Sequence, residues 1–186
     1  MAGEDFLRIT HYRGKAGSHI IRQLVCYMAA HHSRDFDIVH GAGLLADARK
    51  NLGLLLVGHS HCGKSTLSLG LGAIVMDDDI MLVRRDRMMV AGKMGFVSYK
   101  HPENGRKYLT PLPNGVKEAL VDLVFLLDKK QDGGTVMDVD KVIPRAYAVL
   151  DDLPPLLQKA YARLPPIRVN APIFRLGTRG KMPETL

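Results

Sequence analysis

The residues best suited to chemistry lie in one short stretch, residues 52–66, with the sequence LGLLLVGHSHCGKST. Gly58, four further residues and then Gly63-Lys64-Ser65 match the phosphate-binding P-loop pattern, G-x-x-x-x-G-K-[ST]. In such a loop, backbone N–H groups point inward at the phosphates, the lysine reaches the β- and γ-phosphates, and the serine hydroxyl is a ligand of Mg²⁺. The stretch predicts a site for a nucleoside triphosphate or diphosphate.

The whole loop and the residue after it are predicted to bind the nucleotide: Gly58, His59, Ser60, His61, Cys62, Gly63, Lys64, Ser65 and Thr66. Two of these residues have open roles. His61 is either an ordinary exposed loop histidine or a contact of the γ-phosphate. Cys62 is either a small loop residue or a reactive thiol, since the dipoles of such a loop lower a thiol pKa.

An acidic cluster, Asp77-Asp78-Asp79, follows the apolar residues 73–76. Carboxylates at the end of a strand beside a P-loop hold the metal, and one of them can take a proton from an attacking hydroxyl. Adjacent carboxylates repel one another, and a divalent cation relieves that repulsion. A solvated acidic turn is the alternative.

With these motifs the sequence resembles the HPr kinase/phosphorylase-like domains and their relatives, the phosphoenolpyruvate carboxykinases. Residues 58–65 fit the loop of that family, G-x-S-x-x-G-K-[ST]. The family's second motif, a glycine, a short apolar strand and an Asp-Asp pair, is similar to residues 72–80, with the pair on Asp78 and Asp79. His40 stands where kinase-like members carry a histidine, on the strand before the P-loop strand.

The resemblance implies an α/β P-loop domain with a mixed, largely β core and flanking helices. It also implies Mg²⁺-dependent phosphoryl transfer from ATP or GTP, in which Lys64 and the loop amides stabilise the transferring group and Thr66 binds the α-phosphate. Asp78, Lys64 and His40 are then the catalytic residues, with Asp78 as the general base. A buried structural role is the alternative for His40. The implied metal ligands are Ser65, Asp78 and Asp79.

The acceptor is left open, as a hydroxyl on a protein or a small molecule. The chain lacks the N-terminal half of a carboxykinase and the C-terminal signature of bacterial HPr kinases, so neither carboxykinase activity nor HPr as substrate is expected. Phosphoryl transfer usually needs one more cation. The sequence offers several and does not choose among them: Arg84, Arg85, Arg87, Arg106 and Lys107.

The composition is that of an ordinary globular protein of 186 residues, with a net charge of +7. The charge favours an anionic partner. A nucleic acid is open but not favoured, because the basic segment 163–181 shows no aromatic interleaving of the stacking kind. The two cysteines, Cys26 and Cys62, suggest free thiols in a reducing compartment. With no signal core and no membrane-length apolar run, a cytoplasmic protein without membrane contact is expected.

Residues 1–176 are expected to form one domain, with a strand and helix in 6–32, the nucleotide core in 36–130, helices in 140–164, and a basic, mobile tail at 177–186. Apolar runs and turn residues predict the elements. The expected strands are 6–12, 36–46, 52–57, 73–76, 80–83, 87–90, 94–99, 108–112, 120–127 and 172–176. The expected helices are 18–32, 66–71, 140–150 and 155–164, with a turn at 128–134.

Three functions follow as hypotheses. The first is a Mg²⁺-dependent kinase that transfers the γ-phosphoryl group to a hydroxyl. The second is a catalytically weak nucleotide-binding regulatory or adaptor protein, and the third is a nucleic-acid-associated ATPase. A GTPase is not expected, because no N-K-x-D motif is present. The family that the sequence resembles often assembles into rings, so a homo-oligomer stays open.

Overall fold

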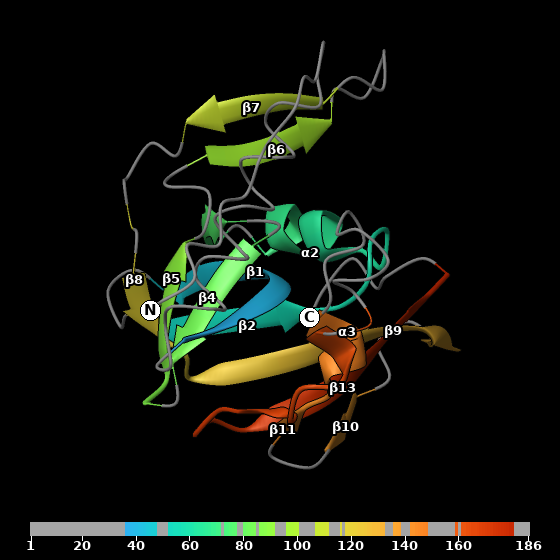
Figure 1. The fold of residues 1–186 in the computed structure, drawn as a ribbon. Coiled ribbons are helices and arrows are strands. Elements are labelled where there is room, and N and C mark those ends of the chain that lie inside the picture. Colours follow the sequence, from blue (N-terminus) through green and yellow to red (C-terminus); the bar gives the residue numbers. More distant parts are fainter. Residues whose placement is uncertain are drawn as a thin grey trace, which may run out of the picture.

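Strands make up most of the structure, as Figure 1 shows. The computed structural model describes residues 36–47, 52–71, 73–77, 80–84, 86–91, 96–100, 107–111, 116, 118–132, 136–138, 142–148, 159 and 161–180. The predicted strand 6–12 and helix 18–32, with Cys26, lie outside the described residues.

The described strands are β1 (Phe36–Asp47), β2 (Leu52–Val57), β3 (Ile74–Asp77), β4 (Ile80–Arg84), β5 (Met88–Ala91), β6 (Phe96–Lys100), β7 (Lys107–Pro111), β8 (Glu118–Leu120), β9 (Leu123–Asp132), β10 (Val136–Asp138), β11 (Val142–Ile143), β12 (Ile167–Arg168) and β13 (Ile173–Arg179). The helices are α2 (Lys64–Gly70) and α3 (Arg145–Ala148).

A nine-stranded mixed sheet has the order β10-β13-β9-β2-β1-β4-β5-β8, with β3 paired to β1. The strand that leads into the glycine-rich loop, β2, lies near its centre. It is antiparallel to β1, in register Gly41↔Val57, and parallel to β9, in register Val57↔Leu126. The predicted strands 36–46 and 52–57 are therefore present, here paired as a hairpin that leads into the loop, and the mixed, sheet-dominated α/β class is correct.

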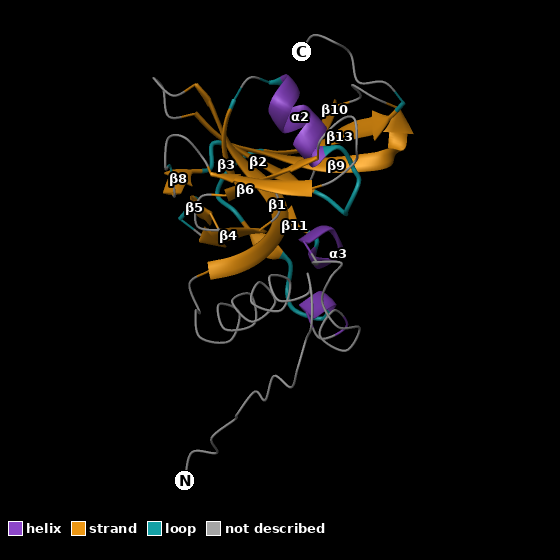
Figure 2. Cartoon of the chain, turned by 90° about the horizontal axis from the view of Figure 1, so that it is seen from above, coloured by secondary structure: helices purple, strands orange, loops and turns teal. Residues whose placement is uncertain are grey.

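Both faces of β2 are buried, which explains its unbroken apolar run. Leu54 and Leu56 pack with Leu67 of α2 on one face, whereas Leu55 and Val57 pack with Ile143 on the other. Figure 2 shows α2 and α3 on opposite faces of the sheet. The β6–β7 hairpin forms a separate two-stranded sheet and contacts the main sheet at β3 (Figure 1).

Several predicted boundaries are wrong where distant pairing decides the structure. The predicted turn at 128–134 is strand as far as Asp132, because β9 pairs with β13 up to Arg179↔Asp132. The same pairing places residues 177–179 in β13, so the strand continues into the predicted mobile tail. Within the predicted helix 140–150, residues 142–143 form β11 and pair with β12, and helix α3 begins only after Pro144.

The other differences are smaller. Helix α2 begins at Lys64 and ends at Gly70, whereas residues 66–71 were predicted. Of the predicted helix 155–164, residues 159, 161 and 162 are helical, and residues 155–158 and 160 lie outside the described part. None of the helices in the described part of the chain has the length and apolar composition of a membrane span.

Gly53 on β2 is expected to tolerate no side chain. A Cβ there would lie 1.8 Å from the backbone oxygen of Leu120, and the Gly53 N–H donates to Asp122 Oδ2 at 2.9 Å. We expect Gly53→Ala to lower the free energy of unfolding by about 2 kcal/mol or more, because backbone must move to relieve the contact. Urea denaturation measures this free energy of unfolding.

Gly70→Ala is the matched control for that substitution. Gly70 ends α2, and a Cβ there meets nothing within 4 Å. Alanine is expected to leave the stability unchanged or raise it by up to about 1 kcal/mol, since glycine is the poorer helix former. Equal losses in the two variants would contradict the packing described for Gly53.

Candidate functional site

The glycine-rich loop, residues 58–63, joins the end of β2 to the start of α2. Two residues of the loop have a left-handed backbone conformation: Gly63 with φ 99° and His61 with φ 62°. Gly58 lies so close to the rest of the loop that a Cβ there would be 2.6 Å from Cys62 Sγ. The first helical bond, Leu67 N–H to Gly63 O at 2.9 Å, then starts α2. The predicted strand, loop and helix are therefore present.

The Lys64 side chain folds back over this loop. Its ammonium donates to Gly58 O at 2.6 Å and to His59 O at 3.0 Å, and the residue is 6% exposed. A buried ammonium needs such partners, because desolvation without them is costly. The result is a positive charge held inside the loop.

Cys62 packs inside the loop, at 4% exposure, with its Sγ 4.0 Å from Lys64 Nζ. Burial raises the pKa of this thiol above its ordinary value, and the opposing charges of Lys64 and Lys129 do not offset the burial. The thiol is therefore protonated near neutral pH. This favours the packing role of Cys62 over the reactive one.

The remaining loop residues face solvent. His59, Ser60 and His61 are exposed, as are Ser65 and Thr66 at the start of α2. Lys64 and Cys62 thus form the buried floor of the site, and a polar rim surrounds it. The rim presents hydroxyl and imidazole groups to solvent.

One rim contact was not predicted from the sequence. The ring of Tyr147, on α3, lies 5.8 Å from the ring of His59, tilted by 31°. The two residues are far apart in the sequence, and no motif contains Tyr147. Only the folding of α3 onto this end of the sheet brings them together.

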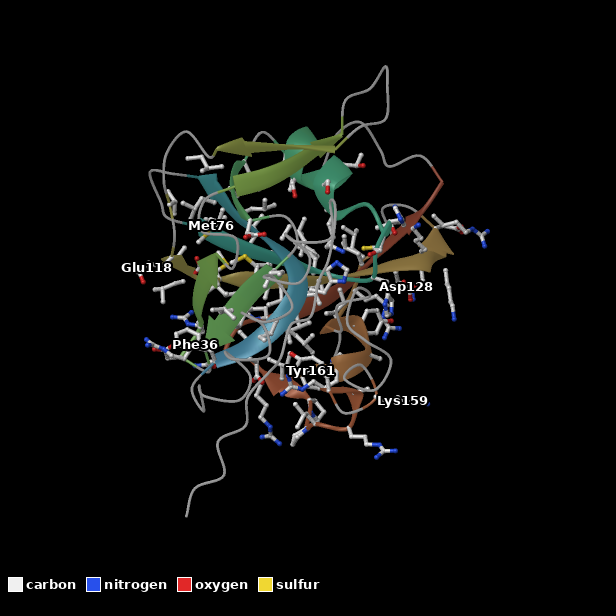
Figure 3. All side chains as sticks on the ribbon, turned by 45° about the horizontal axis from the view of Figure 1, so that its top comes forward. Phe36, Met76, Glu118, Asp128, Lys159 and Tyr161 are labelled. Carbon is white, nitrogen blue, oxygen red and sulfur yellow. The ribbon has the colours of Figure 1, made fainter. Side chains whose placement is uncertain are left out.

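Arg145 fixes α3 in that position. It is 8% exposed, and its guanidinium donates to Asp37 Oδ1 at 2.6 Å, to Tyr161 Oη at 3.0 Å and to Pro165 O at 2.6 Å. Tyr161 also donates to the carbonyl of Ile38. Figure 3 labels Tyr161 beside α3. One buried cation therefore ties α3 and the segment before β12 to β1.

His40 lies on β1 directly beside the loop. Its carbonyl accepts a hydrogen bond from Gly58 N–H at 3.3 Å, and its residue is 4% exposed. Because side chains alternate along a strand, His40 shares a face with Ala42, which packs in the same cluster as Cys62. The structure thus brings His40 to the predicted place.

Asp77, the first residue of the acidic cluster, meets β1 near His40. Asp77, the last residue of β3, pairs with Gly43 and is fully buried, and its Oδ1 accepts from Ile80 N–H at 3.1 Å. Ile80 in turn pairs with His40. Asp78 and Asp79 stand between Asp77 and Ile80 in the sequence and lie outside the described residues. Within the described part, no three His, Cys, Asp or Glu side chains are grouped to hold a metal.

Arg84 and Arg87, the described arginines among the candidate cations, lie away from the loop. Arg84 pairs with Phe36, whereas Ile80 pairs with His40, so Arg84 is at the opposite end of β4, about 13 Å away along the strand. Its guanidinium binds Asp86 at 2.8 Å, and Arg87 belongs to the same turn. Arg85 and Arg106, and the Lys107 side chain, lie outside the described part.

Comparison with known proteins yields distant similarities in fold, all among solved structures. No protein-family model and no curated protein matches the chain. Among solved structures, the HPr(Ser) kinase/phosphatase from Coxiella burnetii is similar over 76% of this chain and 79% of that chain, at 18% sequence identity and a TM-score of 0.42.

Proposed function

We propose that the protein is a P-loop kinase of the HPr-kinase-like kind. It binds ATP or GTP with Mg²⁺ on the loop between β2 and α2 and transfers the γ-phosphoryl group to a hydroxyl of a protein or small molecule. The single observation that supports this most is the Lys64 ammonium, held inside the loop by the carbonyls of Gly58 and His59. A fixed cation at a glycine-rich loop suits a phosphate chain.

Different residues of the loop bind different phosphates of the nucleotide. Lys64 binds the β- and γ-phosphates together with the loop amides, and Thr66 binds the α-phosphate. Because the Lys64 side chain is already in place before nucleotide arrives, little reorganisation accompanies the reaction. The Lys64 ammonium then stabilises the negative charge that develops on the transferring phosphoryl group.

The residues around β3 supply the remaining chemistry. The oxygen donors of Ser65, Asp78 and Asp79 are of the kind Mg²⁺ prefers, and the exposure of Ser65 fits such a role. Bound Mg²⁺ would neutralise charge on the β- and γ-phosphate oxygens. Asp78 takes the proton of the acceptor hydroxyl, whose oxygen bonds to the γ-phosphorus while the bond to the bridging oxygen breaks and the nucleoside diphosphate leaves. His40 lies beside the loop and contacts the γ-phosphate.

The test separates binding from turnover. Asp78→Asn is expected to bind ATP within about threefold of the wild type and to lose phosphate release by about 100-fold, the usual contribution of a general base. Fluorescent-nucleotide titration and a phosphate-release assay measure the two quantities.

Glu118→Gln, an exposed carboxylate on β8, is the control and is expected to change neither. Undiminished phosphate release in Asp78→Asn would refute its role as base. Binding without release in the wild type would instead favour the regulatory or adaptor function.

A further inference from the structure

Strand β9 brings further residues to the phosphate loop. It runs parallel to β2 in the register Val57↔Leu126, and this pairing continues to the end of β2. One residue further, a Cβ on Gly58 would lie 3.2 Å from both the Cβ and the carbonyl oxygen of Leu127. The chain of β9 therefore passes directly beside the first glycine of the loop.

Lys129 is the first cation on β9 after this contact. Leu127 packs in one cluster with Cys62 and Leu67, on the α2 face of the sheet. Lys129 follows Leu127 by two residues, at the point where the register between β9 and β13 shifts after Gly177↔Asp128. Figure 3 labels the intervening Asp128 on β9.

Among the described residues Lys129 has no ion-pair partner, and its charge acts on the loop. Lys129 is exposed, and among the described residues no carboxylate lies within ion-pair distance of it. Its positive charge lowers the pKa of the Cys62 thiol, an effect that burial outweighs. The ammonium is thus close enough to influence a group inside the loop.

We propose that Lys129 is a second phosphate-binding cation, which contacts the nucleotide phosphates from β9 while Lys64 contacts them from within the loop. The inference rests on the proposed function. Phosphoryl transfer needs positive charge beyond the loop lysine. The described arginines that the sequence offered, Arg84 and Arg87, lie at the far end of β4.

Neighbouring lysines provide a matched test. Lys130 is also exposed, carries the same charge and follows Lys129 directly, but it is not among the charges that act on the Cys62 thiol. We expect Lys129→Gln to weaken Mg²⁺–ATP binding about tenfold or more, as for the loss of a charge-assisted hydrogen bond. Lys130→Gln is expected to stay within twofold of the wild type, and Lys129→Arg to restore most of the affinity.

A second readout needs no nucleotide. In a Cys26→Ser background, the pH dependence of Cys62 alkylation gives the pKa of this thiol. We expect that pKa to rise in Lys129→Gln and to stay unchanged in Lys130→Gln, because Lys129, and not Lys130, lowers the pKa of Cys62.

The outcomes separate the two proposals. Equal ATP affinities of Lys129→Gln and Lys130→Gln, in a protein whose wild type binds ATP, would overturn the role of Lys129 alone. An unchanged Cys62 pKa in Lys129→Gln would do the same. A wild type that binds no ATP would overturn the proposed function, and this inference with it.

Discussion

Lys64→Ala is expected to weaken ATP binding by about 1,000-fold. The ammonium is held inside the loop, and its contacts to two phosphates would each contribute roughly 1.5–3 kcal/mol as hydrogen bonds between charged groups. The substitution also leaves the carbonyls of Gly58 and His59 without their present donor. Competition against a fluorescent nucleotide measures the change.

Lys130→Ala is the control for the loss of one positive charge, since Lys130 is exposed on β9. It is expected to bind ATP as the wild type does. The thermal melt of Lys64→Ala shows whether the variant is folded. A folded Lys64→Ala that binds ATP within threefold of the wild type would mean that the loop does not hold the phosphates.

Arg145→Met is expected to lower the free energy of unfolding by about 3 kcal/mol, because it leaves Asp37 and the carbonyl of Pro165 without their donor in a largely buried setting. For a chain of this size the loss corresponds to roughly 6–12 °C in Tm. Methionine keeps the length of the side chain, so the loss reports the polar contacts rather than a cavity. Urea denaturation and a thermal melt measure it.

Arg84→Met supplies the comparison for that loss. The Arg84–Asp86 pair is exposed, at 40% and 54%, whereas the Arg145–Asp37 pair is 8% and 28% exposed. Exposed pairs contribute about 0–1 kcal/mol, so little change is expected. Similar losses in the two variants would show that Arg145 does not anchor α3.

The loop and its hairpin were predictable because their determinants are local. The run 54–57, Gly58 and Gly63-Lys64-Ser65 specify strand, loop and helix within a few residues, and the structure has all three. His40 was also placed correctly beside the loop, because β1 and β2 are joined by a short connection.

The parts of the fold and of the site that were not predicted depend on pairing between segments that are distant in the sequence. The sequence does not reveal that β9 pairs in parallel with both β2 and β13, so the extension of β9 to Asp132 was predicted as a turn. For the same reason the contact of Tyr147 with His59, and the course of β9 beside Gly58, have no sequence signal. A mixed sheet of this order is specified by burial on both faces of its central strands, which periodicity alone does not resolve.

The most direct test of the central claim is calorimetric titration of the wild-type protein with ATP and with GTP, each with and without Mg²⁺. Nucleotide binding at the β2–α2 loop predicts saturable binding of one nucleotide per chain, stronger than that of AMP, which lacks the phosphates that Lys64 would contact. A folded protein that shows no saturable binding of either triphosphate would contradict the account at its first step.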